Sequence, residues 1–455
     1  MKKILLLVPD GVGIKNYLFS DVFKNVNYEV SLLHDFDDKT LLDVQQTVNF
    51  HKSHKLSYYK ESLKEKFFRE LIHLSRLKYN ARRVHNKSIL KSWNPKKKNF
   101  QIALFYKLIH LTSLVVIHYK FILFLEKYYQ KLLKKNKFYN WSYKFLEEEK
   151  PDIIFCTHQR ALKAPTIFNA AKELDIKSIT VIYSWDNVPK ARLALKADYY
   201  FVWSKHMYEE LIQFYPEIGE DQIEITGTPQ FEFYAKNDNI IDKNHFYDKY
   251  SLDINKKLIC FSGDDVKTSP YDPDYLEDVA ESIIANNMEN DYQIVFRRCP
   301  VDISGRFDEV VKKYKNVIRE IPPLWNFNND GWTTVYPLHD DVKLLVSLCY
   351  YSDTVINVGS TMAFDFGMFE KPCIFINYDQ QEAKNWSVET IYNYQHFRSM
   401  PDKNAVIWLN SKEEIKSSLL KAISKNGVDI KSWFDKVIED PNMASHLIKE
   451  KLKTI

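Results

Sequence analysis

The residues best suited to binding a phosphate lie between positions 355 and 365. An apolar stretch ends in Gly359, Ser360 and Thr361, and a helix is expected to follow. Such a turn presents backbone N–H groups and hydroxyls at a helix N-terminus, where the helix dipole also favours an anion. Asp365 lies one helical turn further on, where it could bond a ribose hydroxyl. An ordinary helix cap followed by a solvated aspartate would give the same pattern.

A second polar turn begins at Gly263, directly after the apolar run 257–262. Ligands of doubly wound sheets bind beyond the carboxyl ends of the strands, so this turn could contact a donor phosphate or sugar. A plain polar turn is the alternative. No HxxH, CxxC or DxD-type signal stands out at the end of a strand, so neither a metal nor a cofactor is expected.

Two α/β units are needed to position these turns, and the sequence predicts both. Residues 1–35 have the pattern strand, glycine-containing loop, helix and strand, which opens a doubly wound sheet. Alternating strands and helices return after Pro151 and again from Lys257. The expected divisions are a first domain over 1–235, a linker over 236–256, and a second domain over 257–455 whose helices from about 411 pack back onto the first.

Residues 51–145 interrupt the first domain. They lack glycine and strand alternation, so several inserted helices are predicted. Residues 51–140 hold 22 Lys or Arg against 4 Asp or Glu, although the whole chain carries only +4. This excess indicates an anionic surface as partner. The apolar stretch 102–125 is interrupted by charges, which favours an interfacial or a core helix over a spanning one. A solvated basic insert without a lipid role is the alternative.

The segment 355–379 resembles the donor-binding stretch of GT-B glycosyltransferases. It is most similar to capsule- and surface-polysaccharide transferases and to the CDP-glycerol glycerophosphotransferase-like group, whose pattern runs Ser-Ser, Phe-Asp-Phe, Lys-Pro and a strand ending in Tyr-Asp. The matching residues are Ser360, Thr361, Asp365, Lys371, Pro372 and Asp379. The resemblance spans about residues 151–380. It implies a GT-B fold, in which two Rossmann-like domains face a cleft, and a reaction without a metal.

The same family has two further turns that find counterparts here. The stretch 227–230, with Thr228 and Gln230, resembles the Gly-(Thr/Asn)-Pro turn that closes the first domain. The loop 184–187, with Trp185 and Asn187, resembles one found in surface-carbohydrate transferases. Both are therefore expected on the acceptor side of the cleft.

A third segment departs from the family pattern. The family usually ends a strand of the second domain with Arg/Lys-x-His-Pro, and here Cys299 replaces the histidine. Arg297 or Arg298 would then hold the donor phosphate, since a guanidinium suits phosphate bidentately.

The resemblance also requires a base in the first domain to deprotonate the acceptor hydroxyl. Asp10 is the leading candidate, because Gly11 and Gly13 beside it would let the acceptor approach closely. His158 and Asp186 are the others, and each of the three could instead be a structural loop residue.

The sequence thus predicts a metal-independent glycosyltransferase that uses a nucleotide-sugar donor and a lipid-linked acceptor in surface polysaccharide, capsule or lipopolysaccharide biosynthesis. It would be cytoplasmic and peripheral at the inner face of the plasma membrane. No nucleic-acid partner is expected. Two alternatives remain: a CDP-polyol phosphotransferase, and a non-catalytic basic protein that binds membranes or nucleic acid on a degenerate GT-B fold.

Overall fold

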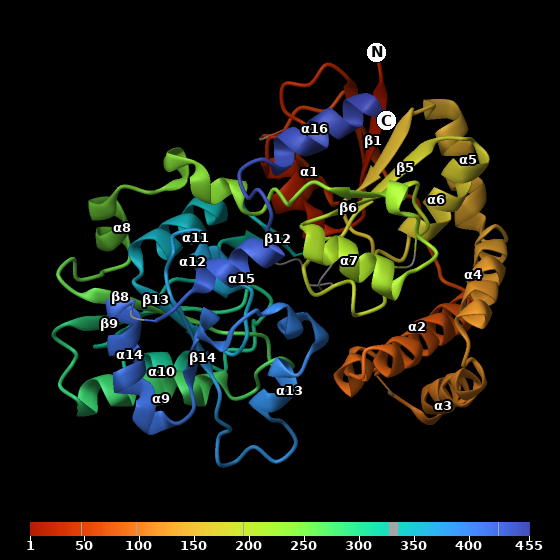
Figure 1. Ribbon diagram of the computed structural model, residues 1–455. Helices are drawn as coiled ribbons and strands as arrows, with labels where there is room; N and C mark the ends of the chain where they lie inside the picture. Colours follow the sequence, from red (N-terminus) through yellow and green to blue (C-terminus); the bar gives the residue numbers. More distant parts are fainter. Residues whose placement is uncertain (47, 97, 194, 327–334, 426) are drawn as a thin grey trace. The chain divides into compact units, whose positions relative to one another are not determined.

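The computed structural model describes residues 1–46, 48–96, 98–193, 195–326, 335–425 and 427–455. The chain forms two compact units, which Figure 1 labels by element. The first unit comprises Met1–Pro229, Tyr394–His396 and Met443–Ile455, and the second comprises Gln230–Asn393 and Phe397–Asn442.

The first unit is built on a parallel sheet with the strand order β3-β2-β1-β4-β5-β6-β7. Its central strands are continuous apolar runs, as strands buried on both faces require. Ile4 of β1, for example, lies opposite Val30 on one side and Ile153 on the other. The strands are β1 (Lys3–Val8), β2 (Glu29–His34), β3 (Lys52–Lys55), β4 (Ile153–Cys156), β5 (Lys177–Val181), β6 (Tyr199–Val202) and β7 (Ile223–Ile225).

Helices join these strands. After β1 the chain forms only short turns, the 3₁₀ turn η1 (Gly11–Gly13) and the π-helical turn η2 (Ile14–Phe19). The α-helices of the unit are α1 (Asp38–Gln45), α2 (Leu63–Arg83), α3 (Phe100–Val115), α4 (Tyr119–Leu133), α5 (Lys137–Glu149), α6 (Ala164–Glu173), α7 (Lys205–Phe214) and α16 (Ala444–Thr454).

The inserted segment is helical, as expected, except at its start. Lys52–Lys55 forms β3, which pairs with β2, and the first inserted helix begins only at Leu63. The sequence of β3 did not predict a strand, because an edge strand pairs through its backbone on one side only and tolerates charged side chains. No helix in the described residues is long and apolar enough to cross a membrane.

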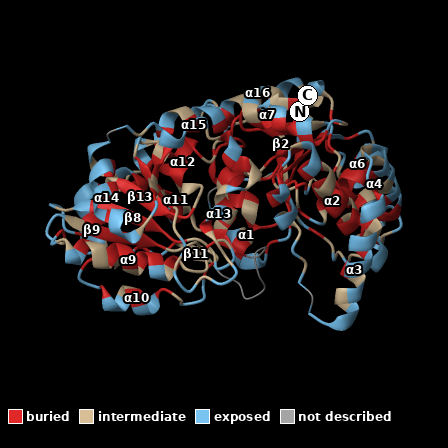
Figure 2. Ribbon diagram, turned by 60° about the horizontal axis from the view of Figure 1, so that its bottom comes forward, coloured by how far each residue is buried: buried red, intermediate tan, exposed pale blue. Residues whose placement is uncertain are grey.

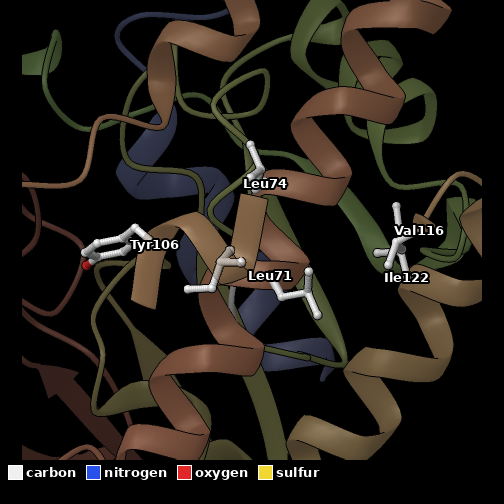
Figure 3. Close-up of a cluster of buried hydrophobic side chains, with 6 residues drawn as sticks. Leu71, Leu74, Tyr106, Val116 and Ile122 are labelled. Carbon is white, nitrogen blue, oxygen red and sulfur yellow. The ribbon is translucent and has the colours of Figure 1, made fainter. Parts of the chain in front are cut away.

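A small apolar core holds the insert together. Leu71 and Leu74 of α2 belong to one cluster with Tyr106 and Ile109 of α3 and Ile122 of α4, and Figure 3 shows part of it. The helices α2, α3 and α4 are thus fixed to one another through α2.

The second unit contains another parallel sheet, with the order β10-β9-β8-β13-β14-β15, and a small antiparallel pair, β11 with β12. Its strands are β8 (Lys257–Ser262), β9 (Tyr292–Arg297), β10 (Ile318–Glu320), β11 (Trp325–Asn326), β12 (Tyr336–Pro337), β13 (Thr354–Asn357), β14 (Cys373–Ile376) and β15 (Ile407–Leu409). Its α-helices are α8 (Lys243–Lys249), α9 (Asp272–Ala285), α10 (Asp308–Lys313), α11 (His339–Tyr351), α12 (Met362–Gly367), α13 (Val388–Tyr392), α14 (Ile415–Ser424) and α15 (Ile430–Val437).

The division of the chain differs in detail from the predicted boundaries. The stretch 236–256 belongs to the second unit and contains α8, and the first unit ends at Pro229. Of the helices beyond residue 411, α14 and α15 belong to the second unit and α16 to the first. Within the first unit, Lys2 Nζ donates to Leu452 O at 3.0 Å and Lys449 Nζ donates to Lys24 O at 2.8 Å, which attaches α16 to the start of the sheet.

Candidate functional site

In both sheets the strand order reverses at one point, and several of the predicted site residues follow the strands at that point. In the first unit the reversal lies between β1 and β4, which precede Asp10 and His158. In the second unit it lies between β8 and β13, which precede Gly263 and Gly359. Neighbouring loops diverge where the order reverses, so this edge of a doubly wound sheet is where ligands bind.

Asp10 and His158, predicted as separate candidates for the base, lie in contact. His158 Nδ1 is 2.6 Å from Asp10 Oδ2, and the other carboxylate oxygen accepts the N–H of Val12 at 3.1 Å. Asp10 is 5% exposed. Both of its oxygens therefore have partners, which makes it a poor base for a substrate hydroxyl.

His158 is the better base. With Nδ1–H donated to the carboxylate, Nε2 carries the lone pair, and it has no hydrogen bond within the described residues. A carboxylate in this position orients the imidazole and stabilises the imidazolium that forms when a proton is taken up. The arrangement can deprotonate a hydroxyl.

Gly13 fits the site for a reason other than acceptor access. A Cβ on Gly13 would lie 2.1 Å from Thr157 Oγ1, so only glycine lets the turn after β1 approach the end of β4 this closely. Gly11 is buried in the same turn. These glycines bring the loops of Asp10 and His158 together.

The loop 184–187 supports His158 through Gln159. Gln159 Nε2 donates to Asn187 Oδ1 at 2.7 Å, and Gln159 Oε1 accepts the N–H of Tyr183 at 3.1 Å. Trp185 is buried and packs edge-to-face on His396, with ring centroids 4.5 Å apart.

Asp186 is held as an ionised partner of Lys190. Burial alone would raise the pKa of this carboxyl, but the Lys190 ammonium in contact with it brings the pKa well below its usual range. Asn187 Nδ2 also donates to Asp186 Oδ1 at 2.6 Å. A carboxylate held in this way is a weak base, so the structure favours a positioning role for Asp186.

The turn 227–230 lies where the first unit ends. Gly227 has a positive φ of 70°, which favours glycine, and Thr228 is buried. Gln230 is the first residue of the second unit. The turn thus marks the division of the chain, and its contact with an acceptor stays a prediction.

In the second unit, the turn after β13 has the expected strand-to-helix form. Gly359 has a φ of 69°, and a Cβ there would lie 2.8 Å from Phe397. Ser360 and Thr361 are partly exposed. The Ser360 N–H donates to Asn357 Oδ1 at 2.8 Å, so this amide is already satisfied within the turn. Phosphate binding by this turn stays a prediction.

Asp365 does not lie at an open surface. It is 4% exposed and accepts a 2.6 Å hydrogen bond from the hydroxyl of Tyr234. Phe364 and Phe366 on either side of it are fully buried. The Phe-Asp-Phe pattern is therefore part of the packing in this structure, and a bond from Asp365 to a ribose hydroxyl stays a prediction.

The two arginines at the end of β9 differ in their surroundings. Arg297 is buried, and its Nη2 lies 2.9 Å from both oxygens of Asp341, which also accepts from Trp325 Nε1 at 2.8 Å. Arg298 is partly exposed and donates to Asp302 O at 2.8 Å. Of the two, Arg298 is the more accessible to a phosphate.

Gly263 follows β8 in close packing, since a Cβ on it would lie 2.9 Å from Phe307. The next residues are fixed by Arg306, which donates to the carbonyl oxygens of Asp264 and Ser269 at 2.7 Å. Burial and the neighbouring carboxylate of Asp272 raise the pKa of Asp264 well above its usual range. Hydrogen bonds to Arg306 thus hold this loop. The described residues contain no group of ligands that could hold a metal ion.

Several residues of the site were not predicted: Gln159, Lys190, Tyr234, Asp341 and Arg306. Four of them act through a partner distant in sequence or through a backbone contact, as Tyr234 does with Asp365 across 131 residues. Lys190 is the exception, because it lies only four residues after Asp186, and this spacing was a signal in the sequence.

Comparisons with known proteins agree with this architecture. Residues 51–229 match the family described as monogalactosyldiacylglycerol (MGDG) synthase. Among solved structures, similarity extends over 100% of this chain and 98% of the Staphylococcus aureus MnaA–UDP structure, with 14% identity and a TM-score of 0.51. The UDP-GlcNAc 2-epimerase of Methanocaldococcus jannaschii is similar over 100% of both chains, with 12% identity and a TM-score of 0.55.

The UDP-GlcNAc 2-epimerase of Neisseria meningitidis, solved with UDP-GlcNAc, is similar over 100% of both chains, with 11% identity and a TM-score of 0.50. No curated protein matches the sequence. The two parallel sheets and these similarities confirm the predicted fold class. The chain has a GT-B glycosyltransferase-like fold.

Proposed function

We propose that this protein is a glycosyltransferase that moves a sugar from a nucleotide-activated donor to a hydroxyl acceptor without a metal. The observation that carries the proposal is the contact of Asp10 with His158, which leaves Nε2 as a base at the point where the first sheet reverses. The family match to MGDG synthase covers residues 51–229 and so includes His158.

In the proposed reaction His158 Nε2 takes the proton of the acceptor hydroxyl while the hydroxyl oxygen attacks the anomeric carbon. The bond from that carbon to the donor phosphate breaks, and the nucleoside diphosphate leaves with the electron pair. Asp10 stabilises the imidazolium. A direct displacement of this kind inverts the configuration at the anomeric carbon.

We assign the donor nucleotide to the second unit, at the turns that begin at Gly263 and Gly359, with Arg298 as the accessible cation. The structural relatives in complex with UDP or UDP-GlcNAc make a UDP-sugar the first donor to test. Arg297 and Asp365 would contribute by holding the frame of this site, since both are buried and paired.

We further propose that the acceptor is lipid-linked and that the protein works at the inner face of the plasma membrane. The support is the outer face of α3. Tyr106, Ile109 and Ser113 are buried on one side of this helix. At 100° per residue, positions 100, 104, 108, 111 and 115 share an arc of about 80° on the opposite side. The exposed apolar residues on α3 are Phe100, Leu104, Leu108, Leu111, Leu114 and Val115.

The positive charge around the exposed face of α3 is suited to binding anionic lipid. Residues 95–137 contain ten lysines and a single acid, Glu126. Figure 2 shows α3 with much of its surface exposed, and Phe121 and Phe124 continue the apolar surface onto α4. A helix that is apolar on its open face and flanked by lysines suits the interface of an anionic bilayer.

The catalytic proposal is tested by measuring transfer with His158→Ala. Removing a general base should lower kcat by about 10²- to 10⁴-fold, with UDP affinity unchanged and part of the rate restored by added imidazole. His446→Ala, on α16 of the same unit, is the matched control. If the protein turns over CDP-glycerol but no nucleotide sugar, it is a polyol phosphotransferase and the proposal is wrong. If it epimerises UDP-GlcNAc without an acceptor, it is an epimerase and the proposal is also wrong.

The membrane proposal is tested by cosedimentation with vesicles. The protein should bind vesicles containing phosphatidylglycerol, bind phosphatidylcholine vesicles weakly, and lose binding at high salt. Replacing Leu104, Leu108 and Leu111 together by Ser should release it, whereas Leu420→Ser on the second unit should not. The membrane proposal is wrong if the wild type does not bind vesicles and forms a dimer that these substitutions dissociate. The apolar face of α3 would then contact a second copy of the chain.

A further inference from the structure

A pocket within the first unit has the character of an anion site, although no predicted residue lies in it. It has a volume of about 60 Å³ and lies between α2, α4 and the loop after residue 190. Because one water needs roughly 10–15 Å³ of such space, the pocket has room for about four waters, or for a group of the size of phosphate.

Most of the charges around this pocket already have partners. Arg69 binds Glu61 and Glu70. Arg76 and Lys196 share the carboxylates of Glu126 and Glu217. These three cations face four carboxylates, so the group as a whole carries one negative charge.

Two further arginines in the pocket are not neutralised in this way. Arg160 and Arg192 make no hydrogen bond or ion pair in the part of the chain that the structure describes. Burial lowers the pKa of the Arg160 guanidinium. Desolvation by surrounding protein atoms and the charge of Arg160 lower the pKa of Arg192, although its side chain is exposed, and the carboxylate of Glu70 acts in the opposite direction. The carboxylate of Asp186 influences Arg160 but is itself paired with Lys190. Arg160 is half-buried and Arg192 is exposed. Because arginine stays protonated, these two like charges repel each other unless an anion binds between them.

Two buried polar groups in the same lining also have no partner. The hydroxyl of Tyr129 and Nδ1 of His73 are both enclosed without a hydrogen bond in the described residues, and each side chain belongs to a residue only 4% exposed. His73 Nε2 is 3.0 Å from Lys190 O and must donate to it. Burial and the nearby Arg192 lower the pKa of His73 to about 3, so Nδ1 is an acceptor.

We propose that this pocket binds a phosphate group, with Arg160 and Arg192 as its cationic ligands. Tyr129 donates a further hydrogen bond, and His73 Nδ1 accepts one from a phosphate hydroxyl. Two guanidiniums, one phenol and one imidazole acceptor match the monoanion of a phosphate monoester, which has anionic oxygen together with one P–OH. Sulfate offers no hydroxyl and is the poorer ligand. The phosphate comes from a lipid headgroup or from a free phosphate ester, which have this chemistry in common.

The binding is tested by calorimetric titration of the full chain with inorganic phosphate and with sulfate. The wild type should bind phosphate more tightly than sulfate. Each of Arg160→Gln and Arg192→Gln should weaken phosphate binding at least about tenfold, because charge-assisted hydrogen bonds are lost. Arg83→Gln is the matched control: this exposed arginine of α2 donates to Gln213 O and lies outside the pocket.

A stability measurement separates a ligand site from a structural one. In phosphate-free buffer, Arg160→Gln should raise the melting temperature, since it removes one of two arginines that repel each other. A phosphate affinity that neither arginine substitution changes, or a melting temperature that Arg160→Gln lowers, would overturn the proposal.

A competition experiment identifies the source of the phosphate. A water-soluble short-chain phosphatidic acid should displace bound inorganic phosphate at lower concentration than glycerol phosphate does if the site takes a lipid headgroup. Equal potency assigns the pocket to free phosphate esters. The phosphate pocket and glycosyl transfer can be tested separately. If phosphate binds and requires the two arginines but no nucleotide binds, the pocket is supported and the proposed glycosyl transfer is rejected. If UDP binds but phosphate does not, the pocket is rejected and glycosyl transfer is retained.

Discussion

Replacing Asp10 by asparagine should slow glycosyl transfer and leave the first unit folded. One carboxylate oxygen of Asp10 caps the turn at Val12, and the other contacts His158 Nδ1 at 2.6 Å. Asparagine caps a helix about as well as aspartate does, so the cap survives the change. The substitution therefore removes mainly the negative charge beside the imidazole.

The size of the effect follows from the charge that develops on His158. Two unit charges about 4 Å apart interact by about 4 kcal/mol at an effective dielectric constant near 20. The imidazolium is only partly formed in the transition state, so we expect a loss of about 2–3 kcal/mol. This corresponds to about a 30- to 150-fold decrease in kcat/KM.

The assay compares initial rates of sugar transfer at limiting acceptor with the wild type, Asp10→Asn and Asp37→Asn. Asp37 is the matched control, because it caps α1 by accepting the Thr40 N–H at 2.7 Å and lies far in sequence from the proposed base. Both variants should keep their melting temperatures, and only Asp10→Asn should lose activity. A folded Asp10→Asn protein with wild-type kcat/KM would refute the role of the carboxylate.

Three further predictions concern stability. Because the pKa of Asp264 is raised, the folded protein keeps a proton that the unfolded chain releases, and the free energy of unfolding falls as pH rises above the ordinary carboxyl range. In denaturant titrations, Asp264→Asn should add about 1–3 kcal/mol to the free energy of unfolding near pH 7.5 and nothing near pH 4. An equal gain at both pH values would contradict this. Asp341→Ala leaves the buried charge of Arg297 without its carboxylate partner and should lower the free energy of unfolding in urea by about 3–5 kcal/mol. A loss below about 1 kcal/mol would show that the pair is dispensable. Gly13→Ala forces a Cβ to within 2.1 Å of Thr157 and should cost about 1–3 kcal/mol by the same measurement, and a neutral result would mean that the loop relaxes freely.

The parts of the fold that the sequence predicted are those with local signals. Strands such as β1 and β13 are short apolar runs followed by polar, glycine-containing turns, and that pattern requires only neighbouring residues to be read. The strand β3 has no such signal, because its four residues are Lys, Ser, His and Lys and it lies at an edge of the sheet. Its pairing with β2 depends on backbone hydrogen bonds, which side-chain types do not reveal.

The candidate site was predicted as residues and not as contacts. Asp10 and His158 each follow a strand, so each could be singled out, but their pairing joins positions 148 apart. The same holds for Asp365, whose burial under Tyr234 depends on how the second unit folds. The role of a carboxylate depends on its partners, and those are set by strand order, which makes neighbours of β1 and β4.

The helix α2 connects the two features that set the inserted segment apart. Leu71 and Leu74 on one face pack in the cluster that holds α3, and Arg69, His73 and Arg76 on another face line the basic pocket. Turning by 100° per residue, one helix can serve both, because positions 69, 73 and 76 lie on one side while 71 and 74 lie on the opposite side. The proposed membrane contact of α3 would therefore also fix the wall of the pocket. The proposed phosphate pocket and the loop of His158, two residues before Arg160, lie in the same unit of the chain.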